Sequence, residues 1–450
     1  MSINVDHIKN VYFIGIGGIG MSALAFHFLK LGKVVYGYDR IQSDISSQLE
    51  EKGAQIEYDF NLKIASSTPM EALIIYTPAI KSDQPVFNYF KTNGYELNKR
   101  SEVLGEITKH KTCIAVAGTH GKTTISAMLT YLLKENNEKV TAFLGGVSQD
   151  YQSNYINTGD EVIVVEADEY DRSLLKLHPD IALVSNIDAD HLDIYKDKSD
   201  LEHTFKAFTD LVKDKTKLFH HKDLHLNGLS LQVEKPADHY TENLNIKNGV
   251  YHFDWMLPNQ KIEDVKLQMP GQHNLFNALS ALALASAYKP KKAKNFAKAL
   301  GYFSGVKRRF NYIVNEEDFA IIDDYAHHPS EIEAVHSALR EMYPGKKAMV
   351  IFQPHLFSRT RDFADEFARS LNRFDSIKLL EIYPARENPI EGITAKFLCD
   401  KIKNNDKEVI EKSDILSKIR TSHCEVTALL GAGDIGLEAN RLKQYYNHEK

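Results

Sequence analysis

The stretch CIAVAGTHGKTT, residues 113–124, decides the fold that we expect for the rest of the chain. Its apolar run at 114–117 predicts a buried strand, and a glycine-rich segment then leads into a helical pattern through Leu133. A strand, a glycine loop and a helix form a phosphate-binding geometry, because glycines let backbone N–H groups approach anionic oxygens and the helix N-terminus adds partial positive charge. Lys122 is placed to reach the β- and γ-phosphates of a nucleotide, and the Thr123 hydroxyl to reach Mg²⁺.

This loop differs from the general P-loop pattern at one position, where Val116 replaces the first glycine. The alternative interpretation is an ordinary strand–helix turn, which is disfavoured because glycine, lysine and two threonines coincide at the joint. The predicted phosphate-binding residues are Gly118, Thr119, His120, Gly121, Lys122, Thr123 and Thr124.

Composition limits the class of protein. A chain of 450 residues with 43% hydrophobic and 26% charged residues predicts about two to four packed domains. The net charge of −6 argues against a general nucleic-acid binder. The three cysteines are scattered, which is typical of a reducing cytoplasm, and no apolar run approaches the roughly 20 residues of a membrane helix. We therefore expect a soluble cytoplasmic protein without membrane insertion.

A second glycine loop, GIGGIG at 15–20, lies near the N-terminus. It follows a predicted strand at 10–14 and precedes an apolar helix at 21–31 and a second strand that ends at Asp39. This order is the dinucleotide fingerprint, in which Gly17 lets a pyrophosphate come close and Asp39 binds a ribose hydroxyl. NAD and a nucleotide sugar both satisfy it, because each carries two phosphates and a ribose.

Acidic residues follow two predicted strands of the middle region. The strand at 161–166 ends at Glu166, for which we favour a role in binding Mg²⁺ beside the glycine loop. For Asp168, Glu169 and Asp171, metal binding and a solvated loop both stay open. The strand at 181–187 leads into DADHLD, where His191 and its neighbouring aspartates form either a metal site or a capped turn.

The segment 196–270 is polar and less regular, with short strands expected near His220 and at 250–253. Asn274 and Asn277 then share one face at the start of an apolar helix, which suits either contact with a nucleotide or N-terminal capping. The basic cluster at 307–309 either neutralises phosphate or forms a solvated linker.

Four predicted strands, at 320–322, 348–352, 376–380 and 426–430, each end in polar or glycine-rich loops. This pattern predicts an open α/β sheet whose site lies at the carboxyl ends of its strands. The expected domains are residues 1–108, 109–309 and 310–450.

Taken in chain order, nine segments resemble the Mur ligases of bacterial peptidoglycan synthesis: GIGGIGMSALA, GTHGKTT, EADEYD, DADHLD, GQHNLFNALSA, GVKRRF, DDYAHHP, FQPHLFSRTRD and GAGDIG. The resemblance implies an α/β fold of three domains. These are a Rossmann-like domain for a UDP substrate, a P-loop ATPase domain with a mostly parallel sheet, and a Rossmann-like C-terminal domain that closes over the site.

The resemblance also implies a reaction, the ATP-dependent ligation of L-alanine to the lactyl carboxylate of UDP-N-acetylmuramate. An acyl phosphate forms first, and the amine of L-alanine then attacks it. ATP and Mg²⁺ are the implied cofactors, UDP-N-acetylmuramate and L-alanine are the implied partners, and the protein is expected to be a cytoplasmic monomer or homodimer. Two alternatives are a recycling ligase that joins a murein tripeptide to the same nucleotide and, from another class, an NAD-dependent oxidoreductase prompted by the N-terminal loop.

The resemblance to Mur ligases also implies roles for individual residues that lie in the shared motifs. The implied catalytic residues are Lys122, His191, Arg309 and Asp324. The implied ATP-binding residues outside the loop are Asn274, Asn277, Arg309 and Asp324. The implied metal ligands are Thr123, Glu166 and His191. The implied UDP-substrate residues are Gly15, Gly17, Gly18, Gly20 and Asp39. The implied amino-acid-binding residues are Tyr325, His327, His355 and Arg359.

One position departs from the family pattern. Some members carry an arginine directly after the Pro-His pair, where this chain has Leu356. Arg359 is therefore expected to bind the amino-acid carboxylate alone or together with Arg361.

Overall fold

The computed structural model describes residues 5–81, 83–188, 195, 197–247, 250–316, 318–385 and 387–448. These residues divide into two compact units. The first unit contains residues 1–245, 252–267 and 276–304, and the second contains residues 246–251, 268–275 and 305–450.

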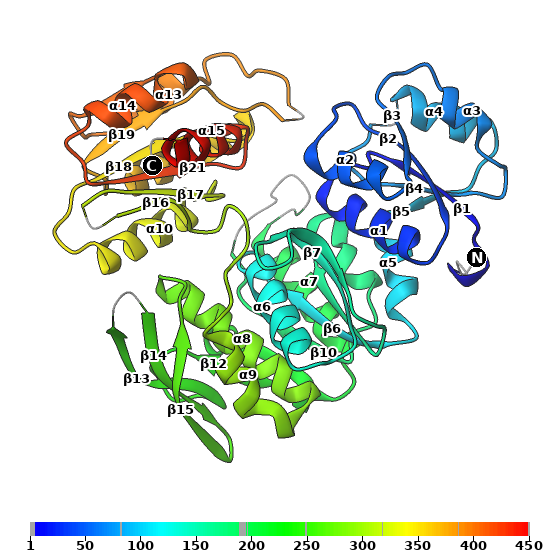
Figure 1. Cartoon of the computed structure of the whole chain (residues 1–450), viewed down its shortest axis with the longest axis horizontal. Helices are drawn as coiled ribbons and strands as arrows, with labels where there is room; N and C mark the ends of the chain where they lie inside the picture. The colour runs from blue at the N-terminus through cyan, green and yellow to red at the C-terminus, as the bar shows by residue number, and fades with distance from the viewer. Residues whose placement is uncertain are drawn as a thin grey trace. The chain divides into compact units, whose positions relative to one another are not determined.

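A five-stranded sheet forms the N-terminal part of the first unit, drawn in blue in Figure 1. Its order is β3-β2-β1-β4-β5 and all neighbouring strands are parallel. The strands are β1 (Asn10–Ile14), β2 (Val34–Tyr38), β3 (Gln55–Glu57), β4 (Leu73–Tyr76) and β5 (Leu97–Lys99). The helices are η1 (Val5–His7), α1 (Ile19–Lys30), α2 (Asp44–Glu51), α3 (Lys63–Ser67), α4 (Pro85–Thr92) and α5 (Arg100–Thr108).

Side-chain alternation along β1 explains why helices cover both faces of this sheet. Val11 and Phe13 belong to a hydrophobic cluster with α1, whereas Tyr12 and Ile14 belong to a separate cluster with residues of α3 and α4. Successive side chains of a strand point to opposite faces, so a strand with apolar residues at all of positions 11–14 needs cover on both sides. The Rossmann-like N-terminal domain that the family resemblance implied is confirmed.

A ten-stranded sheet forms the central part, in the order β15-β14-β13-β12-β11-β10-β6-β9-β7-β8. The pairs from β13 to β7 that the structure describes are parallel, and β8 is antiparallel to β7. The strands are β6 (Thr112–Ala117), β7 (Val140–Ser148), β8 (Ser153–Asn157), β9 (Val162–Ala167), β10 (Ile181–Val184), β11 (Leu218–His221), β12 (Leu229–Gln232), β13 (His239–Lys247), β14 (Val250–Leu257) and β15 (Gln260–Leu267).

The helices of the central part are α6 (Lys122–Glu135), η2 (Tyr170–Lys176), α7 (Lys198–Leu211), η3 (Lys215–Lys217), η4 (Lys222–Leu224), α8 (Gln272–Tyr288), η5 (Pro290–Lys292) and α9 (Ala293–Leu300). The polar segment 196–270 is more regular than its sequence predicts, since it forms α7 and the five strands β11 to β15. The reason is that many of its polar side chains lie on exposed faces, as along β15, where only three of eight residues are buried.

A six-stranded sheet forms most of the second unit, in the order β16-β17-β21-β18-β19-β20. Only β16, among the described strands of this sheet, is antiparallel to its neighbour. The strands are β16 (Asn311–Asn315), β17 (Ala320–Asp324), β18 (Ala348–Phe352), β19 (Ser376–Leu379), β20 (Lys407–Val409) and β21 (Val426–Leu430).

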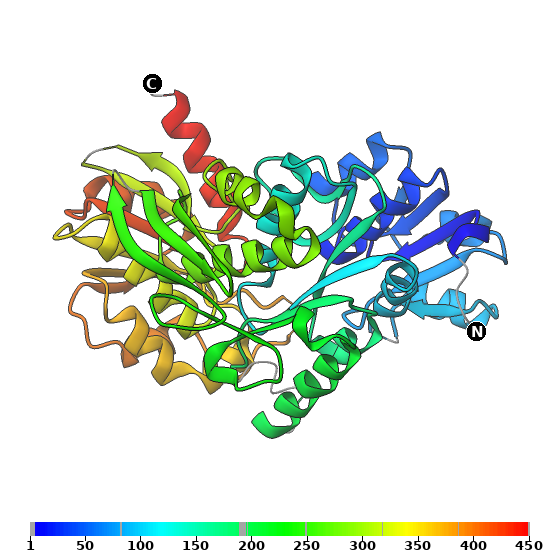
Figure 2. The same ribbon diagram turned by 90° about the horizontal axis from the view of Figure 1, so that it is seen from below.

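The helices of the second unit are α10 (Pro329–Met342), α11 (Phe357–Asp362), α12 (Ala364–Leu371), α13 (Ala395–Lys401), η6 (Lys412–Asp414), α14 (Ile415–Thr421) and α15 (Ile435–His448). The last of these, α15, leads to the C-terminus and is drawn in red in Figure 2. Residues of β18 alternate between one cluster with α10, α12 and α13 and another with α14 and α15. The α/β fold with three sheets is therefore confirmed, whereas the exact domain boundaries at 108 and 309 stay a prediction.

His27 joins α1 to the central sheet within the first unit. Its ring lies 5.3 Å from the ring of Phe143, and its Nδ1 lies 3.0 Å from the hydroxyl of Tyr155. Burial lowers the pKa of His27 to about 4. Between pH 6.5 and pH 4 the unfolded chain therefore binds a proton that the folded chain does not bind, so the free energy of unfolding falls on acidification.

We expect the variant His27→Gln to lose this contribution. For a shift from 6.5 to about 4, the contribution is at most about 3 kcal/mol between neutral pH and pH 4. Urea unfolding of wild type and variant at pH 7 and pH 5 measures it, and the difference between the two proteins isolates His27 from the other histidines. An identical pH dependence in both proteins would contradict the prediction.

Candidate active site

The phosphate loop connects β6 to α6, as predicted. Gly118 has φ +133°, and a Cβ there would lie 2.0 Å from Oγ of Ser185. Gly121 has φ +84° and directly precedes the first residue of α6. Both backbone conformations favour glycine, and the close approach of Ser185 leaves no room for a side chain. The two glycines of GTHGKTT are therefore required by the path of the backbone.

The end of the neighbouring strand β10 supports this loop. Oδ1 of Asn186 accepts hydrogen bonds from the backbone N–H of His120 at 2.8 Å and from the hydroxyl of Thr119 at 2.7 Å. The hydroxyl of Ser185 donates to the carbonyl of His120 at 2.9 Å. Neither residue was predicted from the sequence to belong to the site. Ser185 and Asn186 lie within the predicted strand at 181–187, so nothing in the sequence pattern marked them as site residues.

Lys122 lies at the N-terminus of α6 with its ammonium group turned back to the loop. Its Nζ donates to the carbonyl of Gly118 at 2.5 Å and to the carboxylate of Glu169 at 2.7 Å. Burial lowers the pKa of Lys122, but the carboxylates of Glu169, Asp168 and Glu166 outweigh it and raise the pKa above its ordinary value. The side chain is therefore a buried, charged ammonium group beside the loop.

Glu166 lies at the carboxyl end of β9 beside Thr123, as a shared metal site requires. The Thr123 hydroxyl donates to Oε2 of Glu166 at 3.0 Å, and the backbone N–H of Gly145 donates to Oε1. Burial raises the pKa of this carboxyl, against the effects of Gly145, Lys122 and Thr123. Two of the three predicted metal ligands are thus adjacent.

The third predicted ligand, His191, lies outside the described residues, together with Asp190 and Asp193. Among the residues that are described, no group of three or more histidine, cysteine, aspartate or glutamate side chains is placed to hold a metal ion. The complete metal site therefore stays a prediction.

The remaining acids after β9 connect the two sheets of the first unit. Asp171 pairs with Lys99 at 2.7 Å, and Asp168 lies 3.7 Å from the guanidinium group of Arg100. Lys99 and Arg100 follow each other where β5 meets α5. The acidic loop thus forms ion pairs instead of lying free in solvent.

The N-terminal glycine loop contacts Asp39, the residue predicted to bind a ribose. The backbone N–H of Gly17 donates to Oδ2 of Asp39 at 2.8 Å, and a Cβ at Gly17 would lie 2.9 Å from the same oxygen. Gly15 has φ +86°, and Gly18 precedes the first residue of α1. A Cβ at Gly20 would lie 2.9 Å from the guanidinium group of Arg100. Arg100, which sequence analysis did not select, therefore places a positive charge beside this loop.

The two predicted asparagines have different surroundings. Asn277, in the first unit, lies close to the phosphate loop, since a Cβ at Gly121 would be 2.7 Å from its Oδ1. Asn274, in the second unit, is buried and donates from Nδ2 to the carbonyl of Pro270 at 2.7 Å. The position of Asn277 beside the phosphate loop is compatible with contact to a nucleotide bound there.

In the second unit, Asp324 ends strand β17 and is held by the backbone. Its two carboxylate oxygens accept hydrogen bonds of 2.7 Å from the N–H groups of Phe310 and Ala326. Burial raises the pKa of Asp324 to about 6, against the lowering effect of Arg309. Arg309 also lies over the ring of Tyr325, with Cζ 5.2 Å from the ring centroid. The predicted pair Arg309 and Asp324 is therefore in electrostatic contact.

The four predicted amino-acid-binding residues gather at the carboxyl ends of β17 and β18. The ring of His327 lies 5.3 Å from that of Tyr325 and 6.0 Å from that of His355. Burial lowers the pKa of His327, and the positive charge of Arg359, on α11, also lowers it. Glu331, which sequence analysis missed, contacts both His327 and Arg309.

Comparison with known families covers most of the chain. Residues 10–112 match the Mur ligase family catalytic domain, residues 116–285 match the Mur ligase middle domain, and residues 308–435 match the Mur ligase glutamate ligase domain. The UDP-N-acetylmuramate–L-alanine ligase of Christiangramia forsetii is 50% identical over 450 residues, which is 99% of each chain. The chain belongs to the Mur ligase family.

Other Mur ligases support the same assignment. The UDP-N-acetylmuramate–L-alanine ligase of Flavobacterium johnsoniae is 48% identical over 448 residues, again 99% of both chains. The crystal structure of the UDP-N-acetylmuramate–alanine ligase MurC from Thermotoga maritima has 27% identity and a TM-score of 0.83, covering 99% of this chain and 100% of the other. A murein peptide ligase from Psychrobacter arcticus, at 23% identity and a TM-score of 0.71, shares the fold.

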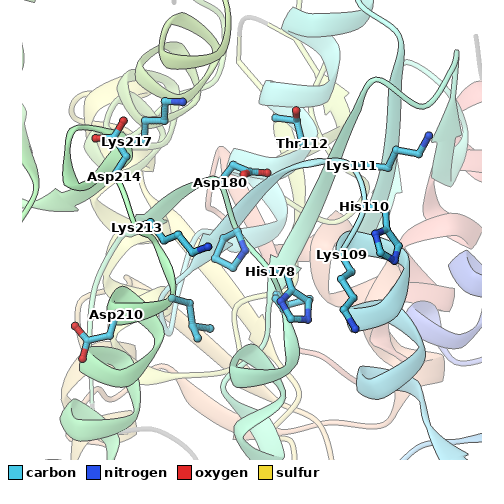
Figure 3. A pocket seen from close by; sticks show the side chains of 13 residues that line it. Lys109, His110, Lys111, Thr112, His178, Asp180, Asp210, Lys213, Asp214 and Lys217 are labelled. Atoms are coloured by element: carbon cyan, nitrogen blue, oxygen red, sulfur yellow. The ribbon is translucent and has the colours of Figure 1, made fainter. Parts of the chain in front are cut away.

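This Mur ligase also has a cavity of about 770 Å³ at the edge of the central sheet where β6 and β10 begin (Figure 3). None of the predicted site residues lines it. Asp214 and Lys217 lie on one side of the view, whereas Lys109, His110 and Lys111 lie on the other. Cationic side chains are thus spread around the wall and mixed with aspartates, so we assign this cavity no ligand.

Proposed function

We propose that this chain ligates L-alanine to the lactyl carboxylate of UDP-N-acetylmuramate, with ATP as the source of the activating phosphoryl group. The observation that carries the proposal is the identity of 50% over nearly the whole length of a UDP-N-acetylmuramate–L-alanine ligase. The reaction serves the synthesis of peptidoglycan precursors. We also propose a cytoplasmic location, because ATP and UDP-sugars are made there; no described helix is long and apolar enough to cross a membrane.

The residues around the phosphate loop fit a nucleotide triphosphate with Mg²⁺. The loop presents backbone N–H groups at a helix N-terminus, and the Lys122 ammonium group lies beside it. Thr123 and Glu166 offer the hydroxyl and carboxylate oxygens that Mg²⁺ prefers, and His191 is proposed as the third ligand. Mg²⁺, when bound, neutralises charge on the phosphate oxygens.

The chain's own contribution to the first step is charge and position. A carboxylate is a poor electrophile, so the lactyl carboxylate first attacks the γ-phosphorus of ATP to give an acyl phosphate and ADP. Lys122 stabilises the negative charge on the phosphoryl oxygens as this bond forms. To do so, its ammonium group must share or leave the carboxylate of Glu169, which lies 2.7 Å away.

The second step needs the amine of the amino acid at the acyl carbon. The C–N bond forms, the bond between the acyl carbon and the phosphate oxygen breaks, and phosphate leaves with the electron pair. We propose that Arg359 pairs with the α-carboxylate and that Tyr325, His327 and His355 surround the rest of the amino acid. The glycine loop at 15–20 with Asp39 is proposed to hold the UDP part of the other substrate.

An assay of phosphate release tests the proposal directly. We expect release that requires ATP, UDP-N-acetylmuramate and free L-alanine together. Release with the murein tripeptide but none with L-alanine would reject the proposal in favour of the recycling ligase. Tight binding of NADH without binding of the UDP-sugar would favour an oxidoreductase instead.

A further inference from the structure

Glu331 lies in the first turn of α10. It contacts His327, one of the predicted amino-acid-binding residues, and Arg309, one of the predicted ATP-binding residues. Its Oε2 accepts a hydrogen bond from the backbone N–H of His327 at 2.9 Å and from that of His328 at 3.2 Å. The same oxygen lies 3.2 Å from Nδ1 of His327. Its other oxygen, Oε1, lies 3.9 Å from the guanidinium group of Arg309. With its side chain 16% exposed, Glu331 is a largely buried carboxylate between a histidine and an arginine.

The surroundings of His327 determine which ring nitrogen carries the proton. Nδ1 lies between two oxygen acceptors, Oε2 of Glu331 at 3.2 Å and the backbone carbonyl of Tyr325 at 3.1 Å. An unprotonated Nδ1 would place its lone pair against both oxygens, whereas an Nδ1–H group satisfies them. Nδ1 is therefore the protonated nitrogen.

The charge state of the ring follows from its burial. The pKa of His327 is lowered to about 4, mainly by burial and also by the charges of Arg359 and Arg309, although Glu331 and the carbonyl of Tyr325 raise it. The imidazole is therefore neutral near pH 7. With Nδ1 protonated, the Nε2 of a neutral ring carries a lone pair and acts as a hydrogen-bond acceptor.

We propose that Glu331 is a positioning residue that holds His327 in the Nδ1–H form, so that Nε2 of His327 accepts a hydrogen bond from the amino group of the incoming amino acid. This inference rests on the proposed function. An amino acid presents a carboxylate and an ammonium group, which need a cation and a neutral or anionic acceptor. Arg359 supplies the cation, and the neutral His327 ring supplies the acceptor.

The proposed contact matters because the amine must be oriented before it reacts. The ammonium group loses two protons in forming the amide, one to the departing phosphate, which leaves as HPO₄²⁻, and one to solvent. An acceptor that holds one N–H group restricts the rotation of the nitrogen and directs it to the acyl carbon. A histidine that is free to change tautomer would offer an N–H donor to the ammonium group in part of the population.

Two variants separate the hydrogen bonds of Glu331 from its charge. In Glu331→Gln, the amide oxygen can replace Oε2, accept from the backbone N–H groups of His327 and His328 and stay close to Nδ1 of His327, so the tautomer of His327 is expected to persist. In Glu331→Ala, these acceptor contacts are lost. Glu333→Gln on the same helix is the matched control, because Glu333 is 44% exposed and lies 3.6 Å from Arg373.

Two nucleophiles show on which step Glu331 acts. Hydroxylamine is a small neutral amine without a carboxylate, and it converts an acyl phosphate to a hydroxamate without needing the amino-acid site. We expect Glu331→Ala to raise KM for L-alanine about tenfold or more, while hydroxamate formation stays within about twofold of wild type. Glu331→Gln and Glu333→Gln are expected to stay close to wild type for both nucleophiles.

NMR provides a readout that does not depend on turnover. Two-dimensional ¹H–¹⁵N spectra of the histidine side chains, assigned with His327→Gln, distinguish the two neutral tautomers. We expect the Nδ1–H form of His327 in wild type and in Glu331→Gln. In Glu331→Ala the carbonyl of Tyr325 is the remaining acceptor for Nδ1, and we expect a mixture of the two neutral tautomers.

The outcomes that would overturn the proposal are distinct. Equal losses with both nucleophiles in Glu331→Ala would show that Glu331 supports the fold or the nucleotide step instead. An unchanged tautomer in Glu331→Ala would also overturn the proposal. A wild-type protein that forms no hydroxamate from ATP and UDP-N-acetylmuramate would reject the proposed function, whereas the NMR spectra would still decide the role of Glu331.

Discussion

Replacing Lys122 with methionine is expected to reduce ATP-dependent phosphate release by at least about a hundredfold. The ammonium group is buried and charged at the N-terminus of α6, beside the glycine loop. Methionine keeps the length and apolar stem of the side chain but removes the charge that would stabilise the transferring phosphoryl group. Binding of UDP-N-acetylmuramate, measured by calorimetry without ATP, is expected to stay unchanged, because the proposed UDP loop is a separate element.

A second variant separates catalysis from folding. Lys122→Met alone leaves Glu169 buried without its cation, which is expected to lower the free energy of unfolding by about 3 kcal/mol. Adding Glu169→Gln removes this buried charge, so the double variant is expected to regain stability without regaining turnover. Recovery of turnover in the double variant, or full turnover in Lys122→Met, would refute the role of Lys122 in the phosphoryl step.

Replacing Arg359 with alanine is expected to raise KM for L-alanine by at least about thirtyfold. Burial lowers the pKa of His327 in the proposed amino-acid site, and Arg359 is one of two arginines whose positive charge lowers it as well. Removing one partner of a charge pair in such a site costs roughly 2–5 kcal/mol. Initial rates at varied L-alanine concentration measure the effect. The hydroxylamine-dependent rate is expected to change little, since hydroxylamine carries no carboxylate.

Arg361 is the matched control for this variant. It lies on the same short helix, but it is 51% exposed and its Nε pairs with Asp362 at 2.7 Å. Arg359 was expected to bind the carboxylate alone or together with Arg361, and we propose that it binds the carboxylate alone. Arg361→Ala is expected to keep KM for L-alanine within about twofold. A large increase in Arg361→Ala with none in Arg359→Ala would reverse the assignment.

Local motifs carried most of the fold assignment. The glycine spacing of GTHGKTT and GIGGIG predicted two strand–loop–helix units, and both occur at the expected residues. The positive φ angles at Gly118 and Gly121 are local backbone conformations that favour glycine, which is why a short sequence pattern predicts them, whereas the close approach of Ser185 to Gly118 depends on the fold. The apolar strands 348–352 and 426–430 were likewise predictable, because every residue in them is buried.

Strands with one exposed face were harder to predict from the sequence. In β15 most residues are polar and exposed, so its apolar positions, Ile262, Val265 and Leu267, give no strong signal by themselves. Their burial depends on the neighbouring strands of a sheet, which a sequence window does not contain. The sequence therefore underestimated how much of segment 196–270 forms regular secondary structure.

The sequence by itself determined the three α/β sheets, the phosphate loop around Lys122, the family, and the residue types of the candidate site. Only the tertiary structure decided which partners these residues have. It placed Asn186 behind the phosphate loop, Arg100 beside the N-terminal glycine loop, and Glu331 between His327 and Arg309. The physical reason is that glycine loops and strand–helix joints are encoded by neighbouring residues, whereas a hydrogen bond to a residue far along the chain forms only when folding brings the two elements together.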